Sequence, residues 1–443
     1  MEERKIYSQR VWVQNKLQPA TVCFNKTITA IHFEKLKGAE DYGNQLIMPG
    51  VIDVHVHVNE PGRTLWEGFD TATQAAAAGG TTTIIDMPLN ASPVTTTRSA
   101  FEQKLIASQG KLNVNVGFYA GLIPGNASHL EALINAGVVG VKCFLTHSGI
   151  DEFPNVTEKD LDDAMPILAK HNLPLLVHCE LYDIEIACDF ENHPSSYQHY
   201  LASRPKQWEN AAIALMIRLC RKHQCAVHIV HVSSAEALHK IAAAKEEGLP
   251  LTAETCSQYL YFNAEDIPDA QSIYKCAPPI RERANNAQLK QALSTGLLDF
   301  ITTDHSPAPP NLKEMETGNL LKAWGGIAGI QFLLTASWAA LKNNMALEQF
   351  IPLVTSHPAR FIQSNTKGTI ALGKDADFVI WNPDQTQTIE AADIFFRYKI
   401  SPYIAQTLQG VVIETIVNGE TVFQDKLIKN KNKGQWLLKK LTK

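Results

Sequence analysis

The sequence predicts an α/β protein in which a (β/α)8 barrel of the TIM type is inserted into a small β-sandwich domain that both termini build. The chain has 443 residues, which is enough for a barrel of roughly 250 residues and a second unit. From Pro49 to about Leu341, short runs rich in β-branched residues alternate with helical stretches, as in repeated βαβ units. Both flanks instead hold short alternating runs, which are typical of antiparallel strands.

Eight apolar runs are the candidate barrel strands, and their near-continuous apolar character is typical of parallel strands buried on both faces. In chain order they are Gly50–Val58, Thr81–Pro88, Leu112–Gly121, Gly137–Leu145, Leu173–Glu180, Cys225–Ser233, Pro250–Cys256 and Leu298–Pro307. The helical stretches between them are Phe69–Ala78, Thr95–Ser108, Thr157–His171, Asn210–His223 and Ala235–Glu247. The link between the seventh and eighth runs is long and irregular.

The two flanks supply the second domain. Residues 1–48 contain the runs VWVQN, ATVCF and TITAIHF, and residues 366–443 contain FVIW, VVIETIVNG and ETVFQ. The pair Asn418-Gly419 is a tight-turn signal between two such runs. We therefore expect residues 1–48 and 366–443 to form the β-sandwich and residues 49–365 to form the barrel.

Composition restricts the partners of the chain. The formal net charge of -5 and the pI near 6.3 show no basic footprint, so we expect no nucleic-acid partner. No apolar run is long enough to span a bilayer, and the polar start MEERKIYSQR does not resemble a signal peptide. The 8 cysteines show no CxxC pairs, which suits a reducing compartment. We therefore expect a cytoplasmic protein without a membrane partner.

Ionisable side chains stand at the carboxyl ends of several predicted strands, where barrels of this type place their catalytic residues. His55 and His57 share one face of the first strand, because side chains two residues apart in a strand point the same way. The other strand ends carry Lys142 (fourth strand), His178 (fifth), His231 (sixth) and Asp304 (eighth).

Two interpretations of these histidines compete, because a single strand histidine is more often a hydrogen-bonded core residue than a metal ligand. Strand parity predicts that His228 points away from the face of His231, so we exclude it. His55 and His57 together favour ligation, since two desolvated imidazoles need two partners. With histidines and an aspartate at matching strand ends, the pattern predicts a site for zinc or another transition metal.

Lys142 is the most unusual residue of the set, because a lysine is almost never fully buried unless it is paired. One interpretation is a lysine at a strand tip whose amino group reaches water. The other is that burial lowers its pKa and leaves a neutral, nucleophilic amine. Such an amine can capture carbon dioxide as a carbamate, an anionic group whose two oxygens can bridge two metal ions.

This arrangement resembles the amidohydrolase superfamily, in its cyclic-amidase branch of dihydroorotases, hydantoinases and allantoinases. The resemblance covers nearly the whole chain, from MPGVIDVHVH to GTIALGKDADFVIWNPD. It implies two divalent metal ions, one bound by His55, His57 and Asp304 and the other by His178 and His231. It also implies that Lys142 carries a carboxyl group (N6-carboxylysine) and bridges the two ions. Zinc is the expected metal, although cobalt, manganese and iron suit the same donor atoms.

The resemblance also implies a mechanism. Two divalent ions lower the pKa of a water that bridges them to near neutrality. The resulting hydroxide would attack a ring carbonyl of a small cyclic substrate. Asp304 would act as general base and then as general acid, passing the proton to the departing ring nitrogen.

Three positions depart from the dihydroorotase pattern. Asn59 stands where an arginine in HxHxR would grip a substrate carboxylate, Ala277 replaces an asparagine before Pro-Pro, and Ala308 replaces a histidine after Asp-His-x-Pro. All three departures concern recognition of a carboxylated pyrimidine ring.

The remaining strings are most similar to those of allantoinases, among them NEPGRTLWEGF, GGTTTIIDMPLN, KCAPPIR and KAWGGIAGIQ. This resemblance implies hydrolysis of the hydantoin ring of (S)-allantoin to allantoate, in the use of purine-derived nitrogen. Asn90 matches an asparagine that faces the substrate, and Ser306 would contact the ring by its backbone or its hydroxyl; the alternatives are a plain turn residue and a plain loop serine. Trp324 would either cover the pocket or only pack against the following helix, and we favour packing.

Two other functions compete with this one. A hydantoinase or dihydropyrimidinase would use the same metal ions with a less selective pocket. A non-catalytic scaffold of the same fold, as in some cytoskeletal adaptors, would lack several of the ligands, whereas this chain keeps all six. The resemblance further implies a homotetramer.

Overall fold

The barrel forms the centre of the molecule. The computed structural model describes residues 3–182 and 188–439 of the chain. Within these ranges, eight parallel strand positions form the barrel: β6 (Val51–Val56), β7 (Thr81–Asp86), β8 with β9 (Asn115–Phe118 and Ala120–Gly121), β10 (Val141–Phe144), β11 (Leu175–His178), β12 (Val227–Ile229), β13 (Leu251–Cys256) and β14 (Phe300–Thr302). Each of them lies inside one of the predicted apolar runs.

The barrel closes through neighbouring parallel pairs. β6, β7 and β8 pair in order, and so do β9 to β14. β8 and β9 are two halves of one barrel strand that is interrupted at Tyr119. A bridge between Val56 and His305 joins the first strand to the end of the last. Large apolar side chains such as Val54, Ile85 and Leu176 pack together in a buried cluster, as expected for a filled barrel.

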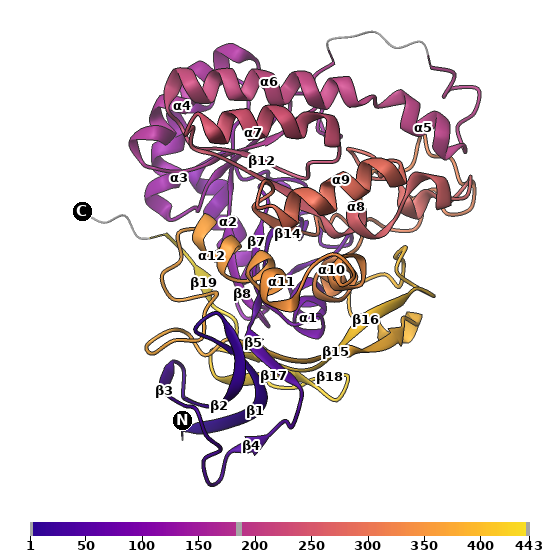
Figure 1. The fold of residues 1–443 in the computed structure, drawn as a ribbon. Helices are drawn as coiled ribbons and strands as arrows, with labels where there is room; N and C mark the ends of the chain where they lie inside the picture. The colour runs from indigo at the N-terminus through magenta and orange to yellow at the C-terminus, as the bar shows by residue number, and fades with distance from the viewer. Residues whose placement is uncertain (1–2, 183–187, 440–443) are drawn as a thin grey trace.

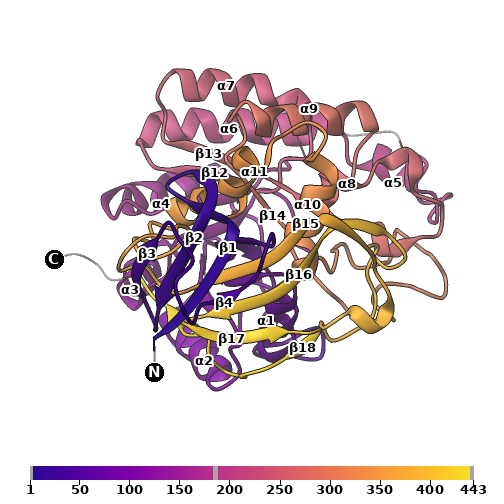
Figure 2. The same cartoon turned by 60° about the horizontal axis from the view of Figure 1, so that its bottom comes forward.

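Helices surround the barrel (Figures 1 and 2). They are α1 (Phe69–Ala78), α2 (Arg98–Ser108), α3 (Leu130–Ala136), α4 (Glu158–Lys170), α5 (Tyr197–Ser203), α6 (Lys206–His223), α7 (Leu238–Glu246), α8 (Ser257–Tyr261), α9 (Arg283–Ser294), α10 (Leu333–Leu341), α11 (Leu347–Val354) and α12 (Ser356–Phe361). α1 has the predicted bounds, whereas α2 begins three residues later than predicted. The reason is a cap at Thr97, whose hydroxyl accepts a hydrogen bond from the amide of Ala100 at 3.2 Å. The irregular link before the last barrel strand contains α8 and α9.

Both termini build one nine-stranded sheet beside the barrel. Its strands are β1 (Arg4–Val13), β2 (Lys16–Phe24), β3 (Ile28–His32), β4 (Glu40–Asp41), β5 (Leu46–Pro49), β15 (Phe378–Thr388), β16 (Thr407–Val417), β17 (Glu420–Gln424) and β18 (Leu427–Ile428). In Figure 1 the indigo N-terminal strands lie beside the yellow C-terminal ones, and β5 joins them by pairing with both β1 and β15.

The sheet folds over itself and encloses a core. The rings of Phe24 and Phe378 lie 5.1 Å apart, although β5 and β1 separate their strands in the sheet order. Neighbouring strands are about 4.8 Å apart, so a flat sheet would not allow this contact. The two layers of the predicted sandwich are therefore parts of one continuous sheet. The predicted fold class, a barrel with a β-domain built from both termini, is confirmed.

The C-terminal segment also reaches the barrel. β19 (Trp436–Leu437) pairs in parallel with β8, and Leu437 packs against the apolar cluster that contains Val54 and Leu176. The end of the segment assigned to the terminal β-domain thus covers barrel residues as well.

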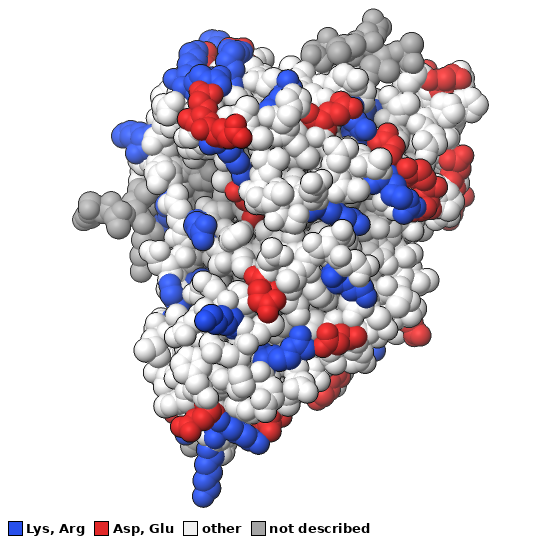
Figure 3. Space-filling view, viewed as in Figure 1, with Lys and Arg blue, Asp and Glu red and all other residues white. Residues whose placement is uncertain are grey.

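The surface gives no large patch of one charge on the face shown in Figure 3, where basic and acidic side chains are interspersed. Among the described helices, none combines the length and the apolar character that a membrane span requires.

Candidate active site

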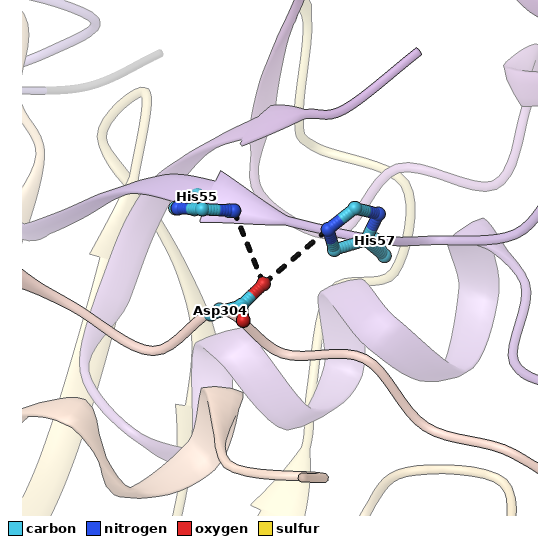
Figure 4. A group of neighbouring side chains, drawn as sticks. All are labelled: His55, His57 and Asp304. Carbon is cyan, nitrogen blue, oxygen red and sulfur yellow. Dashed lines mark ion pairs between the residues drawn. The ribbon is translucent and has the colours of Figure 1, made fainter. Parts of the chain in front are cut away.

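Three of the predicted ligands meet where the first and last barrel strands join. His55 lies in β6, His57 directly follows it, and Asp304 follows β14. The Oδ1 atom of Asp304 lies 3.1 Å from Nε2 of His55 and 3.3 Å from Nε2 of His57. Figure 4 shows the carboxylate pointing toward both imidazoles. Their donor atoms lie within 4.8 Å of one another, as a shared metal ion would require.

The two remaining histidines form a second pair. His178 ends β11 and His231 follows β12. Nδ1 of His178 lies 2.9 Å from Nε2 of His231. The ring of His231 stacks on that of His55 at a centroid distance of 5.4 Å, so the second pair is adjacent to the first cluster.

Lys142 lies fully buried in β10, and its Nζ atom has no hydrogen-bond partner among the described residues. Its Nζ atom lies over the ring of Phe144, 4.8 Å from the ring centroid. Burial lowers the pKa of Lys142 to about 8, although the charges of Asp304 and Glu254 act in the opposite direction. The amino group is therefore both unpaired and easy to deprotonate, which fits a group that is modified and then bound by metal ions.

A cavity of about 390 Å³ brings all the predicted residues together. Its lining includes the six candidate metal ligands and the two candidate substrate contacts, namely His55, His57, Lys142, His178, His231, Asp304, Asn90 and Ser306. The sequence pattern thus identified a set of side chains that share one space in the folded chain.

The second ring nitrogen of three of these histidines is held by an acceptor. Nδ1 of His55 donates to Glu254 at 2.5 Å, Nδ1 of His57 donates to the Leu89 carbonyl at 3.0 Å, and Nε2 of His178 donates to Glu180 at 2.8 Å. Such partners fix the tautomer of a metal-binding histidine and leave the other nitrogen to the metal. The nitrogens that remain are Nε2 of His55 and His57, which approach Asp304, and Nδ1 of His178, which approaches His231. This set of donor atoms fits a metal centre.

Sequence reasoning missed the carboxylates that hold these rings. Glu254 lies fully buried in β13, and Glu180 is buried two residues beyond the strand-end His178. Burial opposes ionisation of Glu254, but His55 and His228 outweigh it and hold the pKa of the carboxyl well below its usual range. A charged residue inside an apolar strand run is the signal that singled out Lys142, and it would have found Glu254 too.

His228, which strand parity excluded from the site, stays outside the cavity lining, but its ring contacts a residue that supports the site. Nε2 of His228 donates to Glu254 at 3.1 Å, so its ring contacts the same carboxylate that holds His55. β12 ends at Ile229, and His231 has a φ of 40°. The strict two-residue alternation therefore does not extend from His228 to His231. His228 does not line the cavity.

Glu254 offers a first test of this arrangement. Replacing Glu254 with glutamine is expected to weaken metal binding by about 10- to 100-fold, because the outer partner of His55 loses its charge. Competition with a chromophoric chelator measures this affinity directly. Glu246→Gln, at an exposed position in α7, is the matched control. Equal metal affinity in the two variants would show that Glu254 does not orient the ligand.

Asn59 does not line the cavity. Its side-chain amide donates to the Pro307 carbonyl at 3.3 Å and accepts a weak hydrogen bond from Asn90 at 3.4 Å. The backbone carbonyl of Asn90 is held by Arg63 at 2.8 Å. Asn59 thus helps to hold the side chain of Asn90 in place. It offers no charged group that could bind a substrate carboxylate.

Trp324 lines the cavity, and its ring meets that of Trp66 edge-on at 4.8 Å. The interpretation that it only packs against the following helix was therefore wrong. It belongs to a loop after β14, whereas α10 begins only at Leu333. Ser306 lies in the same region, where its backbone oxygen would clash with any side chain at Gly326.

Comparisons with known proteins agree with this geometry. The model of the Amidohydrolase family matches residues 46–422. A protein named allantoinase from Arabidopsis thaliana is 43% identical over 398 residues, which cover 86% of this chain and 79% of that protein. An allantoinase from Streptomyces avermitilis is 43% identical over 387 residues, which cover 87% of this chain and 86% of that protein. The solved structure of an L-hydantoinase (dihydropyrimidinase) from Arthrobacter aurescens matches with a TM-score of 0.90 and 27% identity, covering 98% of this chain and 99% of that chain.

Proposed function

The chain belongs to the amidohydrolase family, and from that premise we propose that it hydrolyses the hydantoin ring of (S)-allantoin to allantoate. The observation that carries the proposal is the convergence of the six predicted side chains on one cavity. The substrate is supported by relatives that are named allantoinase and share 43% identity over most of the chain. The reaction would serve the use of purine-derived nitrogen.

Membership of the family implies a divalent metal centre. We assign one ion to His55, His57 and Asp304 and a second ion to His178 and His231, with a carboxylated Lys142 as their shared ligand. Zinc is the expected metal, and cobalt, manganese or iron would suit the same atoms. When bound, such ions supply Lewis-acid activation of water and of the amide carbonyl at neutral pH.

Carboxylation of Lys142 requires a neutral amine. The lone pair of Nζ attacks the carbon of carbon dioxide, a C–N bond forms while the electron pair of one C=O π bond moves onto its oxygen, and the nitrogen releases one proton to water, which leaves an anionic carbamate. The lowered pKa of about 8 and the absence of a partner for Nζ support this assignment. A carbamate would also bring negative charge to a group of imidazoles.

Asp304 is assigned the proton transfers. Its carboxylate would accept a proton from the attacking water and deliver it to the ring nitrogen as the amide C–N bond breaks. Burial opposes ionisation of this carboxyl, but His55 and His57 outweigh it and hold its pKa well below the usual range. The group therefore starts in the ionised form that a base requires.

The substrate contacts and the assembly are further parts of the proposal. Asn90 and Ser306 line the same cavity as the proposed ligands, and we assign both to contacts with the hydantoin ring. Asn59 lies outside the lining, which disfavours a carboxylated substrate such as dihydroorotate. We also infer a homotetramer from the family resemblance, and analytical ultracentrifugation would measure it.

The test is a substrate panel with metal analysis on the purified protein. We expect allantoin to be hydrolysed with a higher kcat/KM than hydantoin, dihydrouracil or dihydroorotate. We also expect removal of metal by a chelator to abolish activity, and zinc with bicarbonate to restore it. A second candidate, a hydantoinase or dihydropyrimidinase, is favoured by the likeness to the Arthrobacter aurescens structure. Faster turnover of hydantoin or dihydrouracil than of allantoin would support that candidate instead.

A further inference from the structure

The wall of the cavity outside the proposed ligands is basic. Among the described residues that line it, the cationic side chains beyond Lys142 are Arg204, Lys275 and Lys322, while Asp304 is the only carboxylate. The charge of Arg204 is matched by Glu180, to which its Nε atom donates at 3.0 Å. Lys322 is exposed to solvent. Lys275 remains as a half-buried cation that faces the cavity.

The contacts of Lys275 leave part of its hydrogen-bonding capacity unused. In the described part of the chain its amino group donates to the carbonyl of Ala323 at 2.6 Å and lies 5.5 Å from the ring centroid of Tyr200, and it forms no ion pair with a carboxylate. An ammonium group has three N–H donors. Burial and the nearby charge of Arg204 lower the pKa of Lys275 to about 8. A polar acceptor from a bound molecule would satisfy the remaining donors.

Lys275 lies in the cavity wall outside the proposed set of metal ligands. Lys275 and Ala277 both line the cavity, whereas Cys276 between them is buried away from it. The ring amide that is hydrolysed must lie at the cluster of His55, His57 and Asp304. The ureido group of allantoin is attached to the ring carbon next to the carbonyl that is hydrolysed, and its own carbonyl oxygen is a strong hydrogen-bond acceptor that hydantoin itself lacks.

We propose that Lys275 is a specificity residue whose amino group donates a hydrogen bond to the ureido carbonyl oxygen of allantoin. This inference rests on the proposed function, and it names a substrate contact other than Asn90 and Ser306. Lys275 holds the ureido end of the substrate, while the ligand cluster acts on the ring. Selection of allantoin over unsubstituted hydantoin follows from this contact.

The test compares two substrates across three variants. Lys275→Met is expected to raise KM for allantoin by about 10- to 100-fold, the usual effect of a lost hydrogen bond to a charged donor, and to leave kcat/KM for hydantoin within about twofold. Lys275→Arg is expected to restore part of the affinity for allantoin. Lys245→Met is the control for loss of a half-buried lysine away from the cavity: Lys245 also donates to a backbone carbonyl, that of Leu297 at 2.9 Å, and it pairs with Asp299 at 2.7 Å.

The outcomes separate the two proposals. An equal loss on allantoin and hydantoin in Lys275→Met would overturn the inference, since the lysine would then act by holding Ala323 in place. Unchanged kinetics on both substrates would overturn it as well. If the wild-type protein opens hydantoin but not allantoin, the proposed function itself fails, and the inference fails with it.

Discussion

Replacing Lys142 with alanine is expected to lower kcat/KM for allantoin by about ten-thousand-fold and to reduce the bound metal below two ions per chain. The reason is that a metal centre stabilises the transition state by several kcal/mol, and each ~1.4 kcal/mol is a factor of ten in rate. Without the amine no carbamate forms, and the two groups of histidines lose their shared anionic ligand. Steady-state kinetics with elemental analysis of the purified variant measure both effects.

Two further variants test whether the loss of activity and metal in Lys142→Ala comes from the missing carbamate rather than from the loss of a buried lysine. Lys142→Glu supplies a carboxylate on a shorter side chain and is expected to recover part of the metal content. Lys104 is also fully buried, but its Nζ pairs with Asp86 at 2.6 Å. Lys104→Met is therefore expected to lower the free energy of unfolding by about 3–5 kcal/mol, because it leaves a buried carboxylate without its partner. Wild-type activity and full metal content in Lys142→Ala would contradict the assignment of the shared ligand.

Replacing Asp304 with asparagine is expected to lower kcat for allantoin by about 100- to 10,000-fold while KM changes little. The amide cannot accept the proton of the attacking water or return it to the ring nitrogen, and general acid–base catalysis contributes about this much. The side-chain oxygen of asparagine can still approach His55 and His57, so part of the metal content is expected to remain. The rate is therefore expressed per bound metal ion, with the wild-type protein as the reference.

This variant separates the two roles of Asp304. A kcat per metal ion within tenfold of wild type would show that Asp304 is a ligand only and that another group moves the proton. Loss of all metal from the variant would leave kcat unmeasurable in that form. In that case kcat is measured with excess zinc in the assay and compared with that of the wild-type protein. Excess zinc refills the metal sites of the variant, but it does not replace the missing carboxylate.

Much of the fold followed from local patterns. Barrel strands are short and buried on both faces, so each appears in the chain as an apolar run, and the described strands lie within those runs. Helix ends were less accurate because they depend on single caps, as Thr97 shows for α2. The pairing of β19 with β8 had no local signal, since a two-residue strand at the end of the chain is defined only by what it contacts.

The sequence by itself determined which polar side chains stand at the carboxyl ends of the barrel strands, because strand period and barrel topology place such ends at one mouth. Only the tertiary structure decided how each imidazole is oriented and what surrounds it. His55 and Glu254 are 199 residues apart in the chain, and Lys275 reaches the cavity from a loop without regular periodicity. Contacts of this kind depend on how distant segments pack, so no pattern among sequence neighbours could have shown them.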